Sequence, residues 1–170
     1  MKRILVIAIV TGLALLQACK KDDDPTCTKE VDAAKLAAVD QTRLAADIEA
    51  IDAYLATNKI TAQIEPHGVR YTINELGTGT KIQCLENAVT VKTTGWLLKF
   101  GTVFQPESEF SLYLNRLIIG WQLALPLVPI GSKITLYIPS GYGYGVFGGA
   151  NGKVPSNANL IFDIELISAK

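Results

Sequence analysis

The pattern of apolar and polar residues changes character along the chain. Residues 4–16 are almost all apolar, whereas residues 30–57 mix Ala, Leu, Ile, Asp and Lys without Gly or Pro. From Gly68 onward, short β-branched and aromatic runs alternate with Gly, Asn and Pro. These sequence patterns predict an export segment, a helical segment and a sheet domain. The predicted units are a signal peptide at 1–18, an anchor and tether at 19–29, a helical segment at 30–59 and a sheet domain at 68–170.

An apolar stripe marks one face of the helical segment. It consists of Leu44, Ile48, Ile51 and Leu55, spaced i, i+4, i+7 and i+11. This spacing is typical of an amphipathic α-helix, and the stripe needs a partner. We favour packing against the sheet domain of the same chain. The alternative is a homodimer in which residues 30–57 of two chains pair through their stripes.

The sheet domain contains runs with the composition of strands. We expect strands at residues 69–73, 88–94, 133–138 and 160–167, each bounded by Gly, Pro or Asn. Residues 114–127 are apolar around Trp121 and predict a short buried helix. The fold class is therefore α+β: an antiparallel sheet with one short helix, preceded by an N-terminal helix.

Composition and charge argue against several classes of protein. The 170 residues include 16 basic and 16 acidic side chains, so nothing points to a nucleic-acid partner. His67 is the single histidine, so a His-based metal site or a Ser-His-Asp triad would depend on it alone. The three cysteines lack the paired spacing of a zinc site. We expect no metal and no cofactor.

The N-terminus resembles the signal of a bacterial lipoprotein. Lys2 and Arg3 precede the apolar run, which is shorter than the ~20 residues that span a bilayer. The run ends in Leu16-Gln17-Ala18-Cys19, which resembles a lipobox with Cys19 as the acylated residue. The alternative is a buried N-terminal helix with an incidental cysteine. Residues 20–25 (KKDDDP) suit a solvated tether or a surface-export signal. We expect a lipid-anchored protein at the outer membrane or surface of a Gram-negative bacterium.

Two further cysteines remain after the proposed anchor. An oxidising compartment permits a disulfide between Cys27 and Cys84. Because Cys27 lies in or near the tether, we favour two free thiols over a bond.

The C-terminal two-thirds resembles the FKBP-type peptidyl-prolyl isomerase family. The second half of the domain carries the specific motifs: Gly120-Trp121, Gly131, Ile138-Pro139, Tyr142-Gly143-Tyr144-Gly145 and the run from Val154 to Leu166. Val89, Val91 and the Thr93-Thr94-Gly95 run fit the first half of the family pattern. The resemblance covers residues 68–170 and implies a half-wrapped antiparallel sheet around a short helix.

The resemblance also implies a site that binds the proline of a polypeptide in an apolar cup. Trp121 is the expected floor of this cup. The other expected site residues are Phe104, Phe110, Val154 and Phe162 in the walls, Leu117 and Ile118 at the rim, and Tyr144. The Ile118 backbone N–H and the Tyr144 hydroxyl are expected to bind substrate carbonyls. Each aromatic residue taken singly is equally typical of an ordinary core.

Two positions depart from the family pattern. Thr93 stands where the family usually has Tyr, and Gln105 where it usually has Asp after the Phe at position 104. We expect both to border the substrate. The favoured function is a prolyl isomerase that assists the folding of exported proteins. The alternatives are a catalytically weak or inactive module that binds proline-containing or unfolded segments, and a structural envelope lipoprotein.

Overall fold

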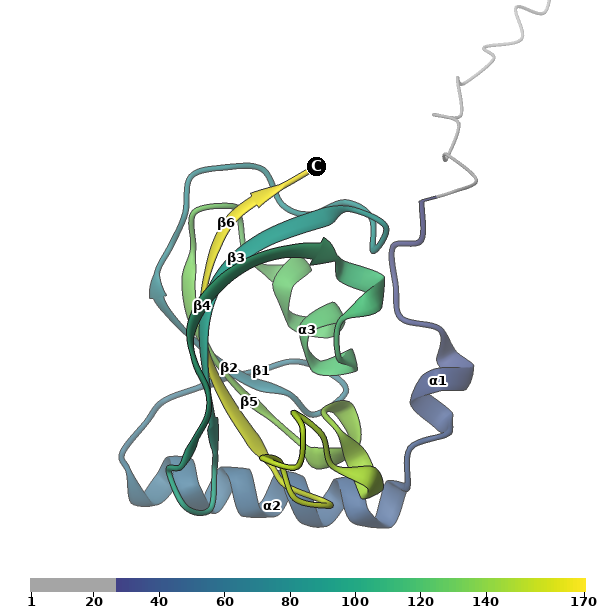
Figure 1. Ribbon diagram of the computed structural model, residues 1–170, viewed down its shortest axis with the longest axis vertical. Coiled ribbons are helices and arrows are strands. Elements are labelled where there is room, and N and C mark those ends of the chain that lie inside the picture. Colours follow the sequence, from purple (N-terminus) through teal and green to yellow (C-terminus); the bar gives the residue numbers. More distant parts are fainter. Residues whose placement is uncertain (1–26) are drawn as a thin grey trace, which may run out of the picture.

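A computed structural model describes residues 27–170, in which six strands form one antiparallel sheet (Figure 1). The strands are β1 (Gln63–Ile64), β2 (Arg70–Glu75), β3 (Ala88–Leu97), β4 (Val103–Tyr113), β5 (Lys133–Ile138) and β6 (Leu160–Ala169). Their order in the sheet is β1-β2-β5-β6-β3-β4. Four of these strands coincide with the runs predicted from the sequence.

The sheet curves around one short helix, α3 (Ile119–Ala124), as Figure 1 shows. Single 3-10 turns, η1 (Leu114–Arg116) and η2 (Leu125–Leu127), flank this helix. Every second residue of β3 is buried, because one face of the strand points toward the core beneath α3. The predicted α+β fold, a half-wrapped sheet around a short helix, is confirmed.

β4 has no counterpart among the predicted strands. Its residues include Pro106 and a polar stretch from Glu107 to Glu109, a composition that argues against a central strand. The structure places β4 at the edge of the sheet, where it pairs only with β3. An edge strand tolerates proline and exposed polar residues because one of its sides needs no hydrogen bonds.

The N-terminal helical segment is divided into α1 (Ala33–Ala37) and α2 (Gln41–Thr57). The division follows from two aspartates, each of which begins a helix. The Asp32 side chain accepts a hydrogen bond from the Ala34 N–H at 2.8 Å, and Asp40 accepts one from the Arg43 N–H at 3.0 Å. Such N-caps stabilise helix starts by about 1 kcal/mol each. The N-terminal helical segment predicted for residues 30–59 thus consists of two helices, of which α2 carries the apolar stripe.

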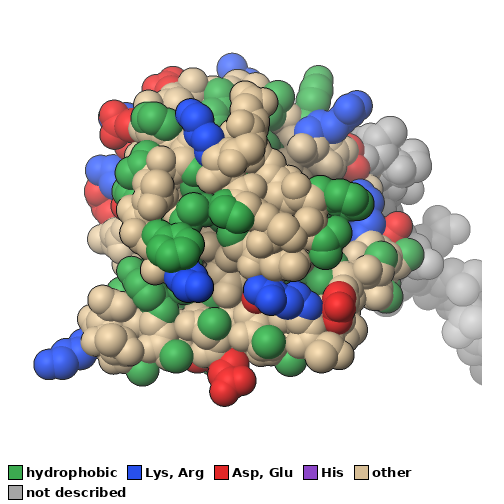
Figure 2. Space-filling model, turned by 60° about the horizontal axis from the view of Figure 1, so that its bottom comes forward, with side chains coloured by type: hydrophobic (Ala, Val, Ile, Leu, Met, Phe, Trp, Pro, Cys, Tyr) green, Lys and Arg blue, Asp and Glu red, His purple; other side chains and the backbone are tan. Residues whose placement is uncertain are grey.

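α2 packs against its own chain. Leu44, Ile51 and Leu55 are buried, and the last two join a cluster with Leu98 and Tyr137 on the face of the sheet opposite α3. Figure 2 shows this side of the molecule, where Lys and Arg side chains lie along the boundary between α2 and the sheet domain. This packing supports the intramolecular prediction for the stripe.

A second contact fixes the C-terminal half of α2. The Arg70 guanidinium on β2 donates from Nε and Nη2 to the two carboxylate oxygens of Asp52, at 2.8 and 3.0 Å. Arg70 is only 8% exposed, so its charge depends on this partner.

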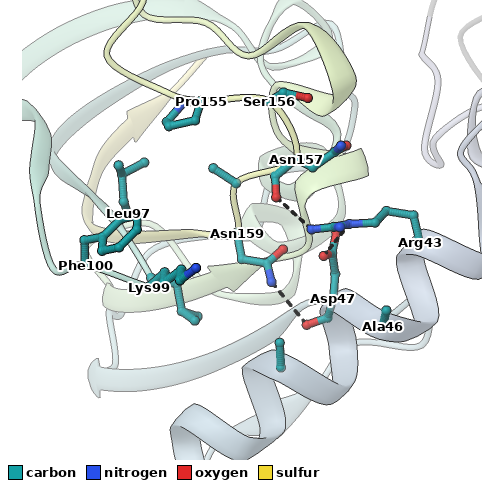
Figure 3. A pocket seen from close by; sticks show the side chains of 13 residues that line it. Arg43, Ala46, Asp47, Leu97, Lys99, Phe100, Pro155, Ser156, Asn157 and Asn159 are labelled. Carbon is teal, nitrogen blue, oxygen red and sulfur yellow. Dashed lines mark hydrogen bonds and ion pairs between the residues drawn. The ribbon is translucent and has the colours of Figure 1, made fainter.

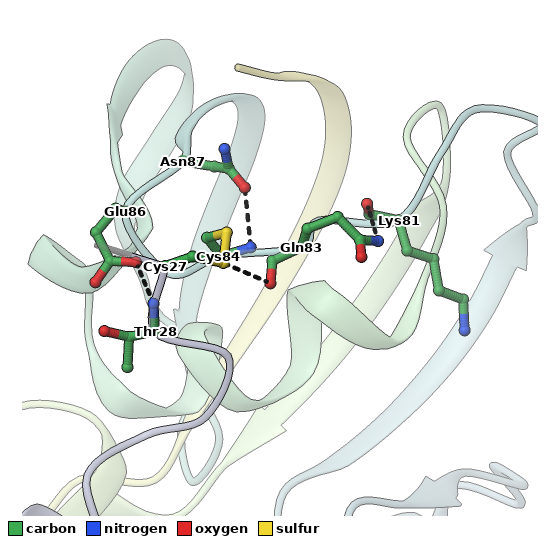
Figure 4. The surroundings of a disulfide bond; sticks show 7 residues. All are labelled: Cys27, Thr28, Lys81, Gln83, Cys84, Glu86 and Asn87. Carbon is green, nitrogen blue, oxygen red and sulfur yellow. Dashed lines mark hydrogen bonds between the residues drawn. A yellow bond between two sulfur atoms is a disulfide. The ribbon is translucent and has the colours of Figure 1, made fainter. Parts of the chain in front are cut away.

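A disulfide joins the start of the described chain to the loop before β3 (Figure 4). Cys27 and Cys84 are 57 residues apart in sequence, and their Cα atoms are 5.0 Å apart. The prediction of free thiols is wrong. The Thr28 N–H donates to the Glu86 carboxylate at 2.8 Å, and the Leu85 N–H donates to the Thr28 carbonyl at 2.7 Å. These bonds hold the residue after Cys27 beside Cys84.

Some predictions concern residues outside the described part of the chain. These are the signal peptide at 1–18, the acylation of Cys19 and the tether as far as residue 26. Between residues 27 and 170, no helix combines the length and the apolarity that crossing a bilayer requires.

Candidate active site

A small pocket of about 70 Å³ opens between the sheet and α3. Its walls come from β4, β6, α3, the loop before α3, and the segment between the 3-10 turns η3 (Ser140–Tyr142) and η4 (Gly145–Phe147). The lining residues are Gln105, Phe110, Leu117, Ile118, Trp121, Tyr144 and Phe162. Pockets for drug-sized ligands occupy roughly 300–1,000 Å³. This pocket is therefore suited to one small ring rather than to a large cofactor.

The indole of Trp121 forms the base of the pocket and is 3% exposed. The Phe162 ring meets it edge to face, with centroids 5.1 Å apart and planes at 90°. The Phe110 ring stacks on it, with centroids 6.1 Å apart and planes at 15°. Both arrangements are favourable for aromatic pairs. The plane of the indole is thus fixed from two sides.

Phe104 supports the pocket from behind. Its ring centroid lies 5.4 Å from that of Phe162 and 6.3 Å from that of Tyr144. Both phenylalanine rings rest on β3 at Gly95, where an added Cβ would lie 2.6 Å from Phe104 Cζ and 2.8 Å from Phe162 Cε1. Any side chain at this position would displace the rings. Gly95 is therefore necessary for the geometry of the pocket.

Besides the buried Trp121 indole N–H, two hydrogen-bond donors at the pocket have no acceptor among residues 27–170. They are the Tyr144 hydroxyl and the Ile118 backbone N–H. Burial raises the pKa of the Tyr144 hydroxyl above its ordinary value, so it keeps its proton at neutral pH. Near Ile118, the Gln122 side chain donates to the Leu117 carbonyl at 2.6 Å and fixes this loop. Both donors are therefore available to acceptor atoms of a ligand in the pocket.

Three of the residues predicted for the site do not line the pocket. Phe104, Val154 and Thr93 are almost fully buried in the core, at 3%, 3% and 1% exposed. The Thr93 hydroxyl and the Trp121 indole N–H are buried without hydrogen-bond partners among the described residues. Gln105 does line the pocket, and its amide donates to the Ser108 hydroxyl at 3.3 Å.

No His, Cys, Ser, Lys, Asp or Glu side chain lines the pocket. His67 lies elsewhere, where its Nδ1 is 2.7 Å from a carboxylate oxygen of Glu65. Across residues 27–170, His, Cys, Asp and Glu side chains nowhere gather in threes that could hold a metal ion. The arrangement provides a surface of aromatic rings and two accessible hydrogen-bond donors.

One buried carboxylate that contacts the segment leading to Tyr144 was not predicted. Asp47 on α2 is 1% exposed and contacts Ser140, four residues before Tyr144. Its position in the sequence indicates burial, because it falls three residues after Leu44 and four before Ile51, on the apolar stripe of the helix. An acid on the apolar stripe of a helix implies a specific buried partner.

Comparison with known proteins identifies the family. Residues 79–167 match the FKBP-type peptidyl-prolyl cis-trans isomerase family. The chain is 33% identical over 138 residues to the FKBP-type peptidyl-prolyl cis-trans isomerase FkpA of Aeromonas hydrophila, covering 75% of this chain and 50% of the relative. It is 37% identical over 125 residues to the outer membrane protein MIP of Legionella longbeachae, covering 70% and 52%.

A solved structure shows the same similarity in three dimensions. The peptidyl-prolyl cis-trans isomerase of Pseudomonas syringae aligns with a TM-score of 0.63 at 30% identity, over 74% of this chain and 94% of that one. The chain spans about half the length of the curated relatives that it matches. The family match includes most of the sheet domain and every residue that lines the pocket. The chain belongs to the FKBP-type peptidyl-prolyl cis-trans isomerase family.

Proposed function

We propose that this protein is a peptidyl-prolyl cis-trans isomerase of the cell envelope that assists the folding of exported proteins. The observation that carries the proposal is the aromatic pocket, with Trp121 at its base and, at its edge, two donors that have no acceptor among residues 27–170. The family match and the envelope location in the name of one relative support it.

The mechanism follows from the physics of the X–Pro bond. Amide resonance gives the peptide bond a rotational barrier of ~18–20 kcal/mol and places negative charge on oxygen and positive charge on nitrogen. The twisted transition state is less charge-separated than the planar amide. A dry aromatic pocket therefore disfavours the planar form more than the twisted one. No bond is cleaved, which suits a pocket that lacks a nucleophile and a general base.

Hydrogen bonds to the flanking carbonyls hold the substrate during rotation. The Tyr144 hydroxyl and the Ile118 N–H are the proposed donors, while Trp121 packs against the proline ring. Each ~1.4 kcal/mol by which these contacts favour the transition state raises the rate about tenfold.

Tyr144→Phe tests the proposed donor, because it keeps the ring and removes one hydroxyl. The lost hydrogen bond is worth ~0.5–1.5 kcal/mol. We expect kcat/KM for an X–Pro peptide to fall roughly two- to tenfold, while the melting temperature stays nearly unchanged. The measurement is a protease-free isomerisation assay on the protein without residues 1–19.

Tyr142→Phe is the matched control for this experiment. Tyr142 is two residues away and 2% exposed, but it does not line the pocket. We expect it to retain the rate of the wild type. Equal rates for Tyr144→Phe and the wild type, with both proteins folded, would contradict the assigned donor.

The second candidate function is a module that binds proline-containing or unfolded segments without isomerising them. Gln105 and Thr93 favour it, because they replace the acid and the tyrosine usual in the family. The same assay separates the two functions when proline-peptide binding is followed by tryptophan fluorescence. Binding without any isomerisation in the wild type selects the module.

The proposed location is the outer membrane or the cell surface of a Gram-negative bacterium, through lipid on Cys19. The apolar run that ends at Leu16-Gln17-Ala18-Cys19 motivates this assignment. We expect Cys19→Ala to abolish the mass increase from acylation and to release the protein from the membrane fraction, because attached acyl chains provide the anchor. An unchanged mass and unchanged fractionation would exclude the lipid.

A further inference from the structure

We propose that Asp47 is a positioning residue for the isomerase reaction, through which helix α2 holds the segment that carries Tyr144. This inference rests on the proposed function, because it concerns the same pocket. It extends the working site beyond the family domain, into the N-terminal segment that precedes residue 79.

Asp47 is 1% exposed, and both oxygens of its carboxylate have hydrogen-bond donors. One oxygen accepts hydrogen bonds from the Ser140 backbone N–H, at 3.0 Å, and from the Ser140 hydroxyl. The other accepts from the Arg43 guanidinium Nε at 2.9 Å, one turn earlier on α2. A buried carboxylate is costly unless such donors surround it. The contact therefore fixes Ser140 relative to α2.

A second segment, residues 157–159, contacts the same part of α2. Figure 3 shows these contacts beside a cavity of about 480 Å³ between α2 and the sheet domain. The Asn159 amide accepts from the Ser140 N–H at 2.9 Å and donates to the Asp47 backbone carbonyl at 3.4 Å. The Arg43 Nη2 donates to the Asn157 carbonyl at 2.9 Å. α2 thus contacts both segments that lead into the pocket.

The chain connects these contacts to the pocket within a few residues. Ser140 opens η3, and Tyr144 follows after Gly143, whose N–H donates to the Ser140 carbonyl at 3.0 Å. Asn159 immediately precedes β6, on which Phe162 lies three residues later. The two segments also bond to each other, from the Asn157 N–H to the Gly145 carbonyl at 2.9 Å.

Close packing reinforces the same contact. Gly141 lies against Val39, where an added Cβ would be 2.4 Å from Val39 Cγ1. The segment from Ser140 to Tyr144 is therefore bounded by the α1–α2 connection as well as by Asp47. A donor contributes to catalysis only when it is held close to the productive position, and a misplacement of about 1 Å can cost a hundredfold in rate.

The test compares two aspartates of the same helix. Asp47→Ala removes the contact with Ser140, whereas Asp52→Ala removes the contact with Arg70 at the other end of α2. Both variants loosen the docking of α2, but only the first acts on the Tyr144 segment. We expect Asp47→Ala to lower kcat/KM about three- to tenfold, and Asp52→Ala to leave it within about twofold.

Amide hydrogen exchange provides a readout independent of the rate. We expect faster exchange at residues 140–144 in Asp47→Ala and unchanged exchange there in Asp52→Ala. Asp47→Asn keeps an oxygen that faces Ser140 and should restore most of the rate. If Asp47→Ala does not fold, Ser140→Ala removes only the hydroxyl donor and should show a smaller loss of the same kind. Equal rates and equal exchange for the Asp47 and Asp52 variants overturn the proposal.

Failure of the isomerase function is distinguishable from failure of this inference. If the wild type binds a proline peptide without isomerising it, the comparison is made on the dissociation constant instead. A weaker affinity in Asp47→Ala than in Asp52→Ala then supports the positioning role. Equal affinities overturn it.

Discussion

Trp121→Ala is expected to lower the free energy of unfolding by about 3–5 kcal/mol and to abolish proline-peptide binding. The cost in stability arises because removing a buried indole leaves a cavity between Phe110 and Phe162, which do not close over it. The loss of binding arises because the proline ring has no surface to pack against. Chemical denaturation measures the first effect, and the affinity for a proline peptide at a temperature where the variant is folded measures the second.

Trp96 provides the matched control, since the chain has two tryptophans. Trp96 is half-buried on the opposite face of the sheet, beside the cluster that contains Ile51. Trp96→Ala should lose less stability and keep the isomerase rate. If folded Trp121→Ala still binds the peptide with the affinity of the wild type, Trp121 is not the floor of the proline-binding pocket.

Reduction of the Cys27–Cys84 disulfide is expected to lower the free energy of unfolding by about 2–4 kcal/mol. The bond closes a loop of 57 residues, and opening this loop increases the conformational freedom of the unfolded chain. Neither cysteine lines the pocket, so the isomerase rate of the folded protein should stay within about twofold. Thermal melts with and without reductant measure the first effect.

The double variant Cys27→Ser with Cys84→Ser is the control for the reductant itself. Its melting temperature should equal that of the reduced wild type and should not respond to reductant. Two free thiols in the native oxidised protein, found by mass after alkylation, would show that the bond is absent.

The sheet was predictable where local sequence matched local structure. β2, β3, β5 and β6 have β-branched residues bounded by turn residues, and their burial follows from these patterns. β4 was missed because its character as an edge strand comes from its place in the sheet rather than from its own residues. The break between α1 and α2 was readable in principle, because Asp32 and Asp40 are both typical N-caps.

The candidate site was predictable only through the motif as a whole. The spacing from Trp121 to Tyr144 indicates a common pocket, although each residue alone resembles core. The particular residue pairs that join distant parts of the chain could not be read from local sequence. The bond from Cys27 to Cys84 and the hydrogen bond from Ser140 to Asp47, 93 residues apart, depend on how α2 and the preceding segment fold back onto the domain.

The disulfide has a consequence for how far the domain extends from a membrane. Cys27 is covalently fixed to the domain, so eight residue steps separate this fixed point from Cys19, the proposed site of the lipid. Eight residue steps span at most about 25–30 Å, even when fully extended. The isomerase domain would therefore stay within about its own diameter of the lipid surface. Its substrates would then be polypeptides that pass close to that surface. Opening the disulfide would allow the domain to lie farther from the membrane.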